Sequence, residues 1–144
     1  MGKSEAVKKI LSTYARIAPS KYGVGVVAIR DIPKGTDPFM GPRKQKWFRA
    51  NMKDFKHADR EIIKMIDDFY IVQKNGDVWV NEDGLNGLHL RWFLNHSTKP
   101  NLFTTDEALS FKAIRKIKKG EPLTYDYRTV DWKWRDPSYK GISK

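Results

Sequence analysis

Residues 92–101 read Trp-Phe-Leu-Asn-His-Ser-Thr-Lys-Pro-Asn, and residues 120–127 read Gly-Glu-Pro-Leu-Thr-Tyr-Asp-Tyr. The first stretch places Asn95, His96 and Asn101 in a polar, turn-forming loop directly after an apolar run. Its proline disfavours helix at the residue before it. A loop so rich in hydrogen-bonding groups suits the binding of a ligand. Taken alone, it is more typical of a structural histidine, and Asn-His-Ser is also a glycosylation acceptor pattern of the Asn-x-Ser type.

The composition indicates one globular domain. The chain has 144 residues, of which 40% are hydrophobic and 12% aromatic, enough for one packed core and too few for two ordinary domains. No apolar stretch approaches the length of a membrane span, and the charged N-terminus lacks the apolar centre of a signal peptide. We therefore expect a soluble, intracellular protein, located in the cytoplasm or, for a viral or non-Sec-secreted protein, in a host nucleus.

The charged and metal-binding residue types narrow the possible partners. The chain has no cysteine, so it has neither disulfides nor thiolate metal sites. Its three histidines, at positions 57, 89 and 96, lack the spacing of metal ligands, and we predict no metal. The net charge of +11 favours an encounter with nucleic acid or an acidic protein surface. Because the basic residues are spread along the whole chain, a solvated basic surface explains this charge equally well.

The first part of the chain has helix and strand patterns in turn. Ser4 predicts a helix N-cap, followed by apolar residues at helical spacing that we expect to pack against the core. Residues 14–17 and 24–30 predict two strands separated by a turn, and 31–36 predicts a second turn. The apolar positions of the helix are Val7, Ile10 and Leu11.

The central part changes character. Aromatic and aliphatic residues in 44–68 recur at intervals of three and four, which predicts two short helices separated near residues 57–59. The Asn75-Gly76 pair predicts a hairpin turn between strands at 69–72 and 78–80. Two further strands are expected at 103–105 and 109–114.

Three motifs in order resemble those of the SET domain, the fold of protein lysine methyltransferases. They are the Tyr-Gly-Val-Gly segment at 22–25 with the Ile-Pro-Lys-Gly turn after it, the Asn-His-Ser loop and the Gly-Glu-Pro-Leu-Thr-Tyr-Asp-Tyr stretch. The resemblance implies a mainly β fold with short helices (α+β), a β-clip-like arrangement of several small sheets with a threaded, pseudoknot-like C-terminal segment. We place the domain at 14–130 with a helical insert at about 44–68, an N-terminal helical extension at 1–13 and a basic aromatic tail at 131–144. Without cysteine, the chain resembles compact, zinc-free viral or bacterial members.

The resemblance implies an S-adenosylmethionine-dependent protein lysine methyltransferase. It assigns the catalytic role to Tyr127 and the tuning of the methylation state to Tyr125, where a tyrosine implies mono- or dimethylation. Spaced i, i+2 on an extended segment, the two would point to one face and could line one channel, although ordinary strand tyrosines show the same pattern. The family's Tyr-x-Gly motif is not clearly present; Phe39 is the nearest match, and Tyr70 is the alternative channel residue.

For the cofactor, the resemblance assigns backbone contacts with the methionine end to Tyr22, Gly23, Val24 and Gly25. The side chain of Asn95 would bind the amino acid end, and the backbone of His96 the adenine. Trp132, or alternatively Trp134, would cover the adenine ring, or both could pack on the core. The product would be S-adenosylhomocysteine.

The substrate class follows from the same resemblance. A lysine-bearing protein is implied, such as a histone, a ribosomal protein or another basic chain, with the enzyme as a monomer or homodimer. The alternative from a different class is a non-catalytic basic module on the SET scaffold that holds nucleic acid or an acidic protein.

Overall fold

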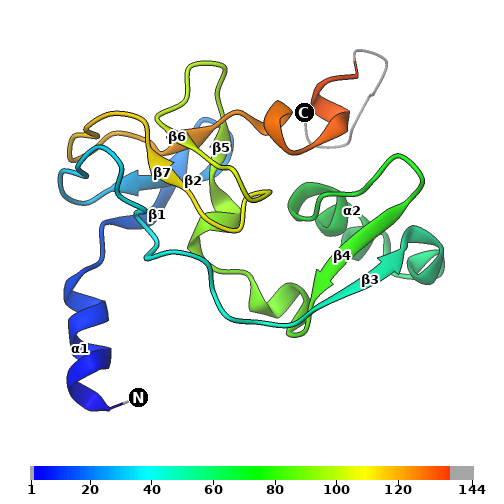
Figure 1. The fold of residues 1–144 in the computed structure, drawn as a ribbon. Coiled ribbons are helices and arrows are strands. Elements are labelled where there is room, and N and C mark those ends of the chain that lie inside the picture. The colour runs from blue at the N-terminus through cyan, green and yellow to red at the C-terminus, as the bar shows by residue number, and fades with distance from the viewer. Residues whose placement is uncertain (1, 137–144) are drawn as a thin grey trace. The chain divides into compact units, whose positions relative to one another are not determined.

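A computed structural model of the protein describes residues 2–136; residue 1 and the end of the predicted tail, 137–144, lie outside the described residues. The chain divides into two compact units (Figure 1). The first unit consists of Met1–Pro42 and Phe93–Asp126, and the second of Arg43–Trp92 and Tyr127–Lys144.

The N-terminal helix forms, but its details differ from the prediction. Helix α1 (Lys3–Leu11) has Gly2 as its N-cap, so Ser4 lies inside the first turn and the predicted cap was wrong. No residue of α1 is buried. Ile10 and Leu11 are 72% and 75% exposed, so the predicted packing of this helix was also wrong.

A hairpin opens the rest of the first unit. Strands β1 (Ala15–Ser20) and β2 (Gly23–Ala28) pair antiparallel over their whole length, with Ser20 opposite Gly23. Gly23 has a φ of +99°, a conformation that glycine adopts at little cost and that this tight turn requires. The two predicted strands are confirmed, with shifted ends.

The other strands of the first unit are two residues long. β5 (Asn95–His96) pairs parallel with β8 (Thr124–Tyr125), and β6 (Leu102–Phe103) pairs antiparallel with β7 (Lys112–Ala113). The strands expected at 103–105 and 109–114 thus form only as the shorter β6 and β7.

The core of the first unit lies among these strands and two turns. The turns at residues 31–36 and 115–120 are joined by a bridge between Ile32 and Ile117. The fully buried larger side chains of this unit are Ile32, Leu94, Leu102, Phe111, Ile117 and Leu123.

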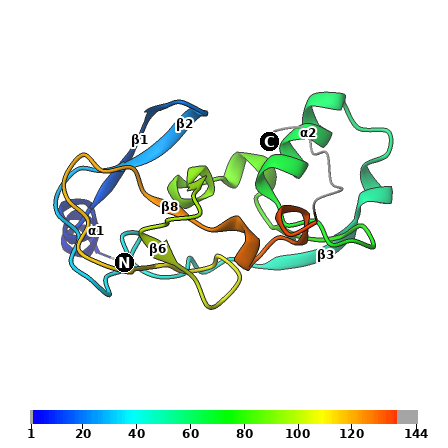
Figure 2. The ribbon, with the colours of Figure 1, turned by 90° about the horizontal axis from the view of Figure 1, so that it is seen from above.

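In the second unit, β3 (Trp47–Asn51) pairs antiparallel with β4 (Asp77–Asn81). Helix α2 (Arg60–Phe69) packs on these strands through Ile66; α2 and β3 are both labelled in Figure 2. The remaining helical turns of this part of the chain are the 3-10 segments η1 (Met52–Phe55), η2 (Gly84–Gly87) and η3 (Leu90–Phe93).

The first of the two predicted insert helices was wrong. Trp47–Asn51 is a strand, and only Met52–Phe55 is helical. Asn51 caps that turn, since its side chain accepts from the Lys53 N–H while its own N–H donates to Asp54. This capping box starts a new element at residue 51 and ends the strand there. The second predicted helix is confirmed as α2.

The predicted hairpin at Asn75-Gly76 is only partly formed. Val72 and Val78 form a single bridge, and the main partner of β4 is β3 rather than residues 69–72. The reason is that Phe69 still belongs to α2, which leaves too few residues for a strand before the turn.

The segment after β8 turns helical. Tyr127 opens the 3-10 turn η4 (Tyr127–Thr129), which η5 (Trp132–Trp134) follows. The strand alternation expected for Tyr125 and Tyr127 was therefore wrong, because extended backbone stops at Tyr125.

The described strands form four two-stranded sheets, and the expected α+β class with several small sheets is confirmed. Within residues 2–136, no helix has the length and apolar character needed to cross a bilayer.

Candidate functional site

Asn95 connects the second half of the first unit to the β1–β2 hairpin. Its Nδ2 donates to the carbonyl oxygen of Val24 at 3.1 Å and lies 3.3 Å from the hydroxyl of Ser20. Among the described residues, none donates a hydrogen bond to its Oδ1. The side chain is half-buried, so this oxygen can accept from a ligand.

Gly25 is required by this contact. A Cβ at position 25 would lie 2.8 Å from Asn95 Nδ2 and 3.2 Å from the Cβ of Ser20. Real Cβ atoms essentially never come as close to a neighbour as the first of these distances, so a side chain here would displace the Asn95 amide. The Gly-x-Gly motif and the Asn-His-Ser loop, distant in the sequence, thus form one local structure.

The hairpin turn itself is open. Tyr22 and Val24 are 64% and 45% exposed, and the ammonium of Lys21 lies 5.0 Å from the centre of the Tyr22 ring. Of the predicted cofactor positions, residues 22–24 are therefore exposed, while Gly25 is buried against Asn95.

His96 lies on the strand next to Tyr125. The two are opposite each other in the β5–β8 pair, and His96 Nδ1 lies 3.7 Å from Asp126 Oδ1. Beyond this pair, the N–H of Ser97 donates to the carbonyl of Tyr125. The imidazole thus has an acidic neighbour, and the backbone of His96 pairs with the strand that carries Tyr125.

Asn101 has a structural role and does not offer its side chain to a ligand, contrary to what the sequence of the loop had suggested. The side chain is buried, and its Nδ2 donates to the carbonyl of Pro122 at 2.8 Å. Its Oδ1 accepts from the N–H of Thr124 at 2.9 Å. Both halves of the amide hold the loop to the strand that carries Tyr125.

We expect Asn101→Ala to lower the free energy of unfolding by about 1–3 kcal/mol, since the Pro122 carbonyl and the Thr124 N–H each lose a part-buried hydrogen bond. Urea unfolding measures this loss. Asn86→Ala, at an exposed position, is the control. A loss below about 0.5 kcal/mol for Asn101→Ala would contradict the structural role.

Phe39 and Tyr125, two predicted channel residues, are connected through a third ring. Phe111 lies 4.9 Å from Tyr125 and 6.3 Å from Phe39, measured between ring centres. Phe39 is positioned by the turn that begins at Asp37, whose Oδ1 accepts its N–H. Phe111 follows the irregular residues 104–110, and the sequence reasoning missed it because nothing local distinguishes it from a core residue.

Tyr127 in the second unit has a strongly perturbed hydroxyl. Burial first, and the charge of Asp68 second, raise its pKa well above the ordinary value for tyrosine, so the hydroxyl stays protonated at neutral pH. The ring of Trp134 meets it edge to face at 5.0 Å. The side chain is half-buried, and a neutral hydroxyl can both donate and accept a hydrogen bond.

Two other predicted residues have internal roles in the second unit. Tyr70 is 5% exposed, and its hydroxyl donates to Asn81 Oδ1, so it is a core residue and not an open channel wall. Trp132 donates from its indole N–H to the carbonyl of Val72 at 2.7 Å. That hydrogen bond fixes the edge of the indole, and the ring is half-buried.

His89 is a second perturbed group. Burial, followed by the charges of Arg91 and Arg43, lowers its pKa to about 4. Its Nε2 lies 3.3 Å from the guanidinium of Arg91, a buried residue. The imidazole is therefore neutral at pH 7.

We expect the stability of the protein to fall between about pH 6.5 and pH 4 because of His89. In this range the unfolded state binds a proton at His89 that the folded state excludes, so acid favours unfolding. Urea unfolding at several pH values, with His89→Gln beside the wild type, isolates the effect. His57→Gln, at an exposed position, controls for loss of an imidazole. If the free energy of unfolding depended on pH equally in His89→Gln and the wild type, His89 would not be the cause of the acid destabilisation.

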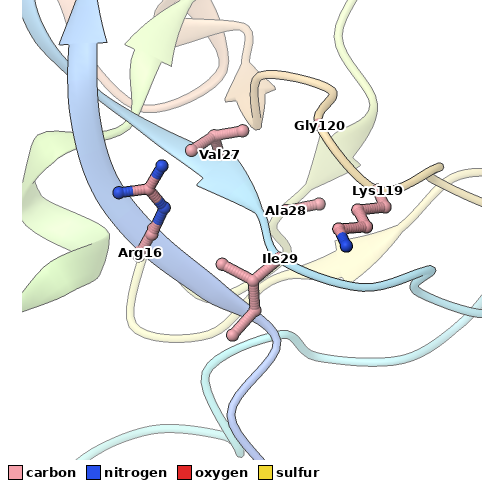
Figure 3. A pocket seen from close by; sticks show the side chains of 6 residues that line it. All are labelled: Arg16, Val27, Ala28, Ile29, Lys119 and Gly120. Atoms are coloured by element: carbon pink, nitrogen blue, oxygen red, sulfur yellow. The ribbon is translucent and has the colours of Figure 1, made fainter.

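A pocket of about 370 Å³ opens elsewhere on the first unit (Figure 3). The side chains of Arg16 and Lys119 border it, around Val27, Ala28 and Ile29, with Gly120 completing the lining. None of the predicted cofactor or channel residues lines this pocket.

Among residues 2–136, no group of three or more histidines and carboxylates is placed to hold a metal ion. The predicted absence of a metal stays a prediction.

Comparison with known proteins gives the family. The model of the SET domain matches residues 23–128, about three quarters of the chain. No curated protein sequence matches significantly.

Similar solved structures agree on the fold. They include ctPRC2 in an autoinhibited conformation bound to S-adenosylmethionine, with 19% identity and a TM-score of 0.54 over 83% of this chain and 16% of that chain. A humanized mutant of the Chaetomium thermophilum Polycomb Repressive Complex 2 bound to an inhibitor has 20% identity and a TM-score of 0.56 over 90% of this chain and 17% of that chain. This chain spans about one sixth of their length. It belongs to the SET domain family.

Proposed function

We propose that the chain is an S-adenosylmethionine-dependent protein lysine methyltransferase. The observation that carries the proposal is the local structure of the first unit, in which Asn95 holds the Gly-x-Gly hairpin and keeps its Oδ1 available. The family match adds the expectation of methyl transfer.

The residues beside Asn95 fit the amino acid end of the cofactor. Asn95 Oδ1 offers an acceptor for an ammonium group, and the exposed backbone of residues 22–24 offers further partners. Gly25 keeps the approach free of a side chain. When bound, S-adenosylmethionine supplies an electrophilic methyl group on its sulfonium and leaves as S-adenosylhomocysteine.

The aromatic residues suit the lysine side chain. Its ammonium, with a reference pKa of about 10.4, must lose a proton before the amine can attack. The half-buried rings of Phe39 and Tyr125, with the buried Phe111 ring between them, provide an apolar aromatic wall. Such surroundings disfavour the ammonium form. The Tyr125 hydroxyl takes up space beside the amine, which supports mono- or dimethylation as the product.

Tyr127 is proposed as the catalytic residue. Its neutral hydroxyl can accept a hydrogen bond from the substrate amine and orient the nitrogen lone pair, which is the main requirement of an in-line transfer. No strong base is needed at this position, since the proton can leave to water.

The test is methyl transfer from labelled S-adenosylmethionine to basic proteins, first histones and a ribosomal protein fraction. Mass spectrometry then identifies the methylated residue and the number of methyl groups. Methyl groups on lysine, one or two per side chain, are expected. Cofactor binding in calorimetry with no transfer to any protein substrate would refute the catalytic proposal.

A further inference from the structure

Helix α2 ends with charges that oppose its dipole. Its last three residues are Asp67, Asp68 and Phe69, and its last turn contains no basic residue. The C-terminal end of a helix carries partial negative charge, so carboxylates are unfavourable there and basic residues are the usual choice. A local rule broken in this way indicates a compensating contact elsewhere in the fold.

Lys133, from η5, provides that contact. Its ammonium donates to Asp67 Oδ1 at 2.9 Å and to the main-chain carbonyl of Asp67 at 3.1 Å. Asp131 Oδ2 lies 3.6 Å from the same nitrogen. The three donors of the ammonium thus face three oxygens. One of them is a carbonyl of the last helical turn, a group that has no partner within its helix.

The ammonium group of Lys133 is buried. The side chain of Lys133 is 2% exposed, and those of Asp67 and Asp131 are 16% and 11% exposed. A buried charge is costly unless it is paired and hydrogen-bonded, and removal of one partner is far more damaging than loss of a surface ion pair. The cluster therefore constrains strongly where η5 lies on the end of α2.

The same cluster is connected to Tyr127. Asp131 accepts the N–H of Lys133 at its side chain, while its own N–H donates to the carbonyl of Tyr127 at 2.9 Å. One residue beyond Lys133, the ring of Trp134 packs edge-on against the Tyr127 ring. Backbone and side-chain contacts thus relate the position of η5 directly to that of the tyrosine.

We propose that Lys133 is a positioning residue that clamps η5 to the C-terminal end of α2 and thereby fixes the orientation of Tyr127. The proposal rests on the catalytic role proposed for Tyr127. Lys133 itself needs no contact with substrate, because it acts through Asp131 and Trp134.

The test compares Lys133→Met, which keeps the apolar stem and removes the charge, with Lys133→Arg, which keeps the charge. Lys64→Met, at an exposed position of α2, is the matched control. We expect kcat for methyl transfer at saturating cofactor to fall about tenfold to a hundredfold in Lys133→Met, since small misplacements of a catalytic group have effects of this size. The Arg variant should recover part of the loss, the control should match the wild type, and KM for the protein substrate should change little.

The second readout is independent of activity. The ring signals of Tyr127, assigned in ¹³C-tyrosine-labelled protein by their loss in Tyr127→Phe, are shifted by the edge contact with Trp134. The chemical shifts of these signals should move toward those of tyrosine in an unfolded chain in Lys133→Met and stay unchanged in Lys64→Met. If Lys133→Met does not fold, Asp67→Asn, which keeps a hydrogen-bond acceptor but removes its charge, should move the same signals in the same direction.

Unchanged Tyr127 signals in a folded Lys133→Met variant would overturn the clamp. Absence of methyl transfer in the wild type would instead count against the proposed function, while the Tyr127 signals would still decide on the clamp. The two proposals therefore fail separately.

Discussion

Tyr127→Phe is expected to lower the rate of methyl transfer by at least about a hundredfold, which is the usual contribution of a positioned hydrogen-bonding group in a reaction of this kind. The substitution removes one oxygen and keeps the ring, so the edge contact with Trp134 can persist. The measurement is the steady-state rate of methyl transfer to the protein that the labelled-cofactor experiment identifies as the substrate. Cofactor affinity, measured by calorimetry, should stay within about threefold of the wild type, because the residues proposed to bind the cofactor's amino acid end lie around Asn95.

The stability of this variant provides a further check. Burial raises the pKa of the Tyr127 hydroxyl, so the folded state resists its ionisation at high pH. The wild type should thus lose stability as the pH rises above about 10, the reference pKa of an unfolded tyrosine, and Tyr127→Phe should lose less. The variant Tyr22→Phe, changed at an exposed position, controls for the loss of a hydroxyl. Undiminished transfer by Tyr127→Phe would exclude Tyr127 as the catalytic residue.

The predictable parts of the fold are those whose secondary structure is determined by residues close together in the sequence. A β-branched run and a glycine turn define the β1–β2 hairpin, and an apolar periodicity defines α2. The strand at Trp47–Asn51 was missed because Phe48, Met52 and Phe55 also match helical spacing. The Asn51 and Asp54 pair was the signal that could have corrected this, since it marks the start of a helical turn.

Sequence motifs predicted which residues belong to the candidate site, but not which of them are in contact. Nothing in the spacing of Val24 and Asn95 predicts that the amide meets the carbonyl, and only the order of the motifs pointed to it. Phe111 and Lys133 were missed for a related reason, because each acquires its role from partners distant in the sequence. For Lys133 a signal did exist, in the two carboxylates at the end of α2, and it required the helix to be read together with its charges.

The tyrosine pair shows the limit of periodicity. The i, i+2 rule holds only while the backbone stays extended, and β8 ends at Tyr125. The role proposed for Tyr127 is supported by the nearby charge of Asp68 and the ring contact with Trp134. It does not depend on strand alternation with Tyr125.

Asn95→Ala should weaken the binding of S-adenosylmethionine by at least about tenfold, the equivalent of one hydrogen bond to a charged group. It should also lower the free energy of unfolding by about 1–2 kcal/mol, because the Val24 carbonyl loses its donor. Calorimetric titration and urea unfolding measure the two effects. Thr98→Ala, at an exposed position of the same loop, should change neither. If Asn95→Ala bound S-adenosylmethionine as tightly as the wild type, Asn95 would not contact the cofactor, and the main support for the proposed function would be lost.

A double-mutant cycle separates the contact with Gly25 from the contact with the cofactor. Gly25→Ala brings a Cβ to within 2.8 Å of Asn95 Nδ2, so much of its cost should arise from displacing that amide. In the Asn95→Ala background the amide is gone, and Gly25→Ala should cost clearly less stability than it does alone, a non-additivity typical of residues in direct contact. Additive losses would mean that Ser20, whose Cβ lies 3.2 Å away, and not Asn95, is what requires the glycine. A coupled pair would instead show that the Asn-His-Ser loop and the Gly-x-Gly turn act as one unit in solution.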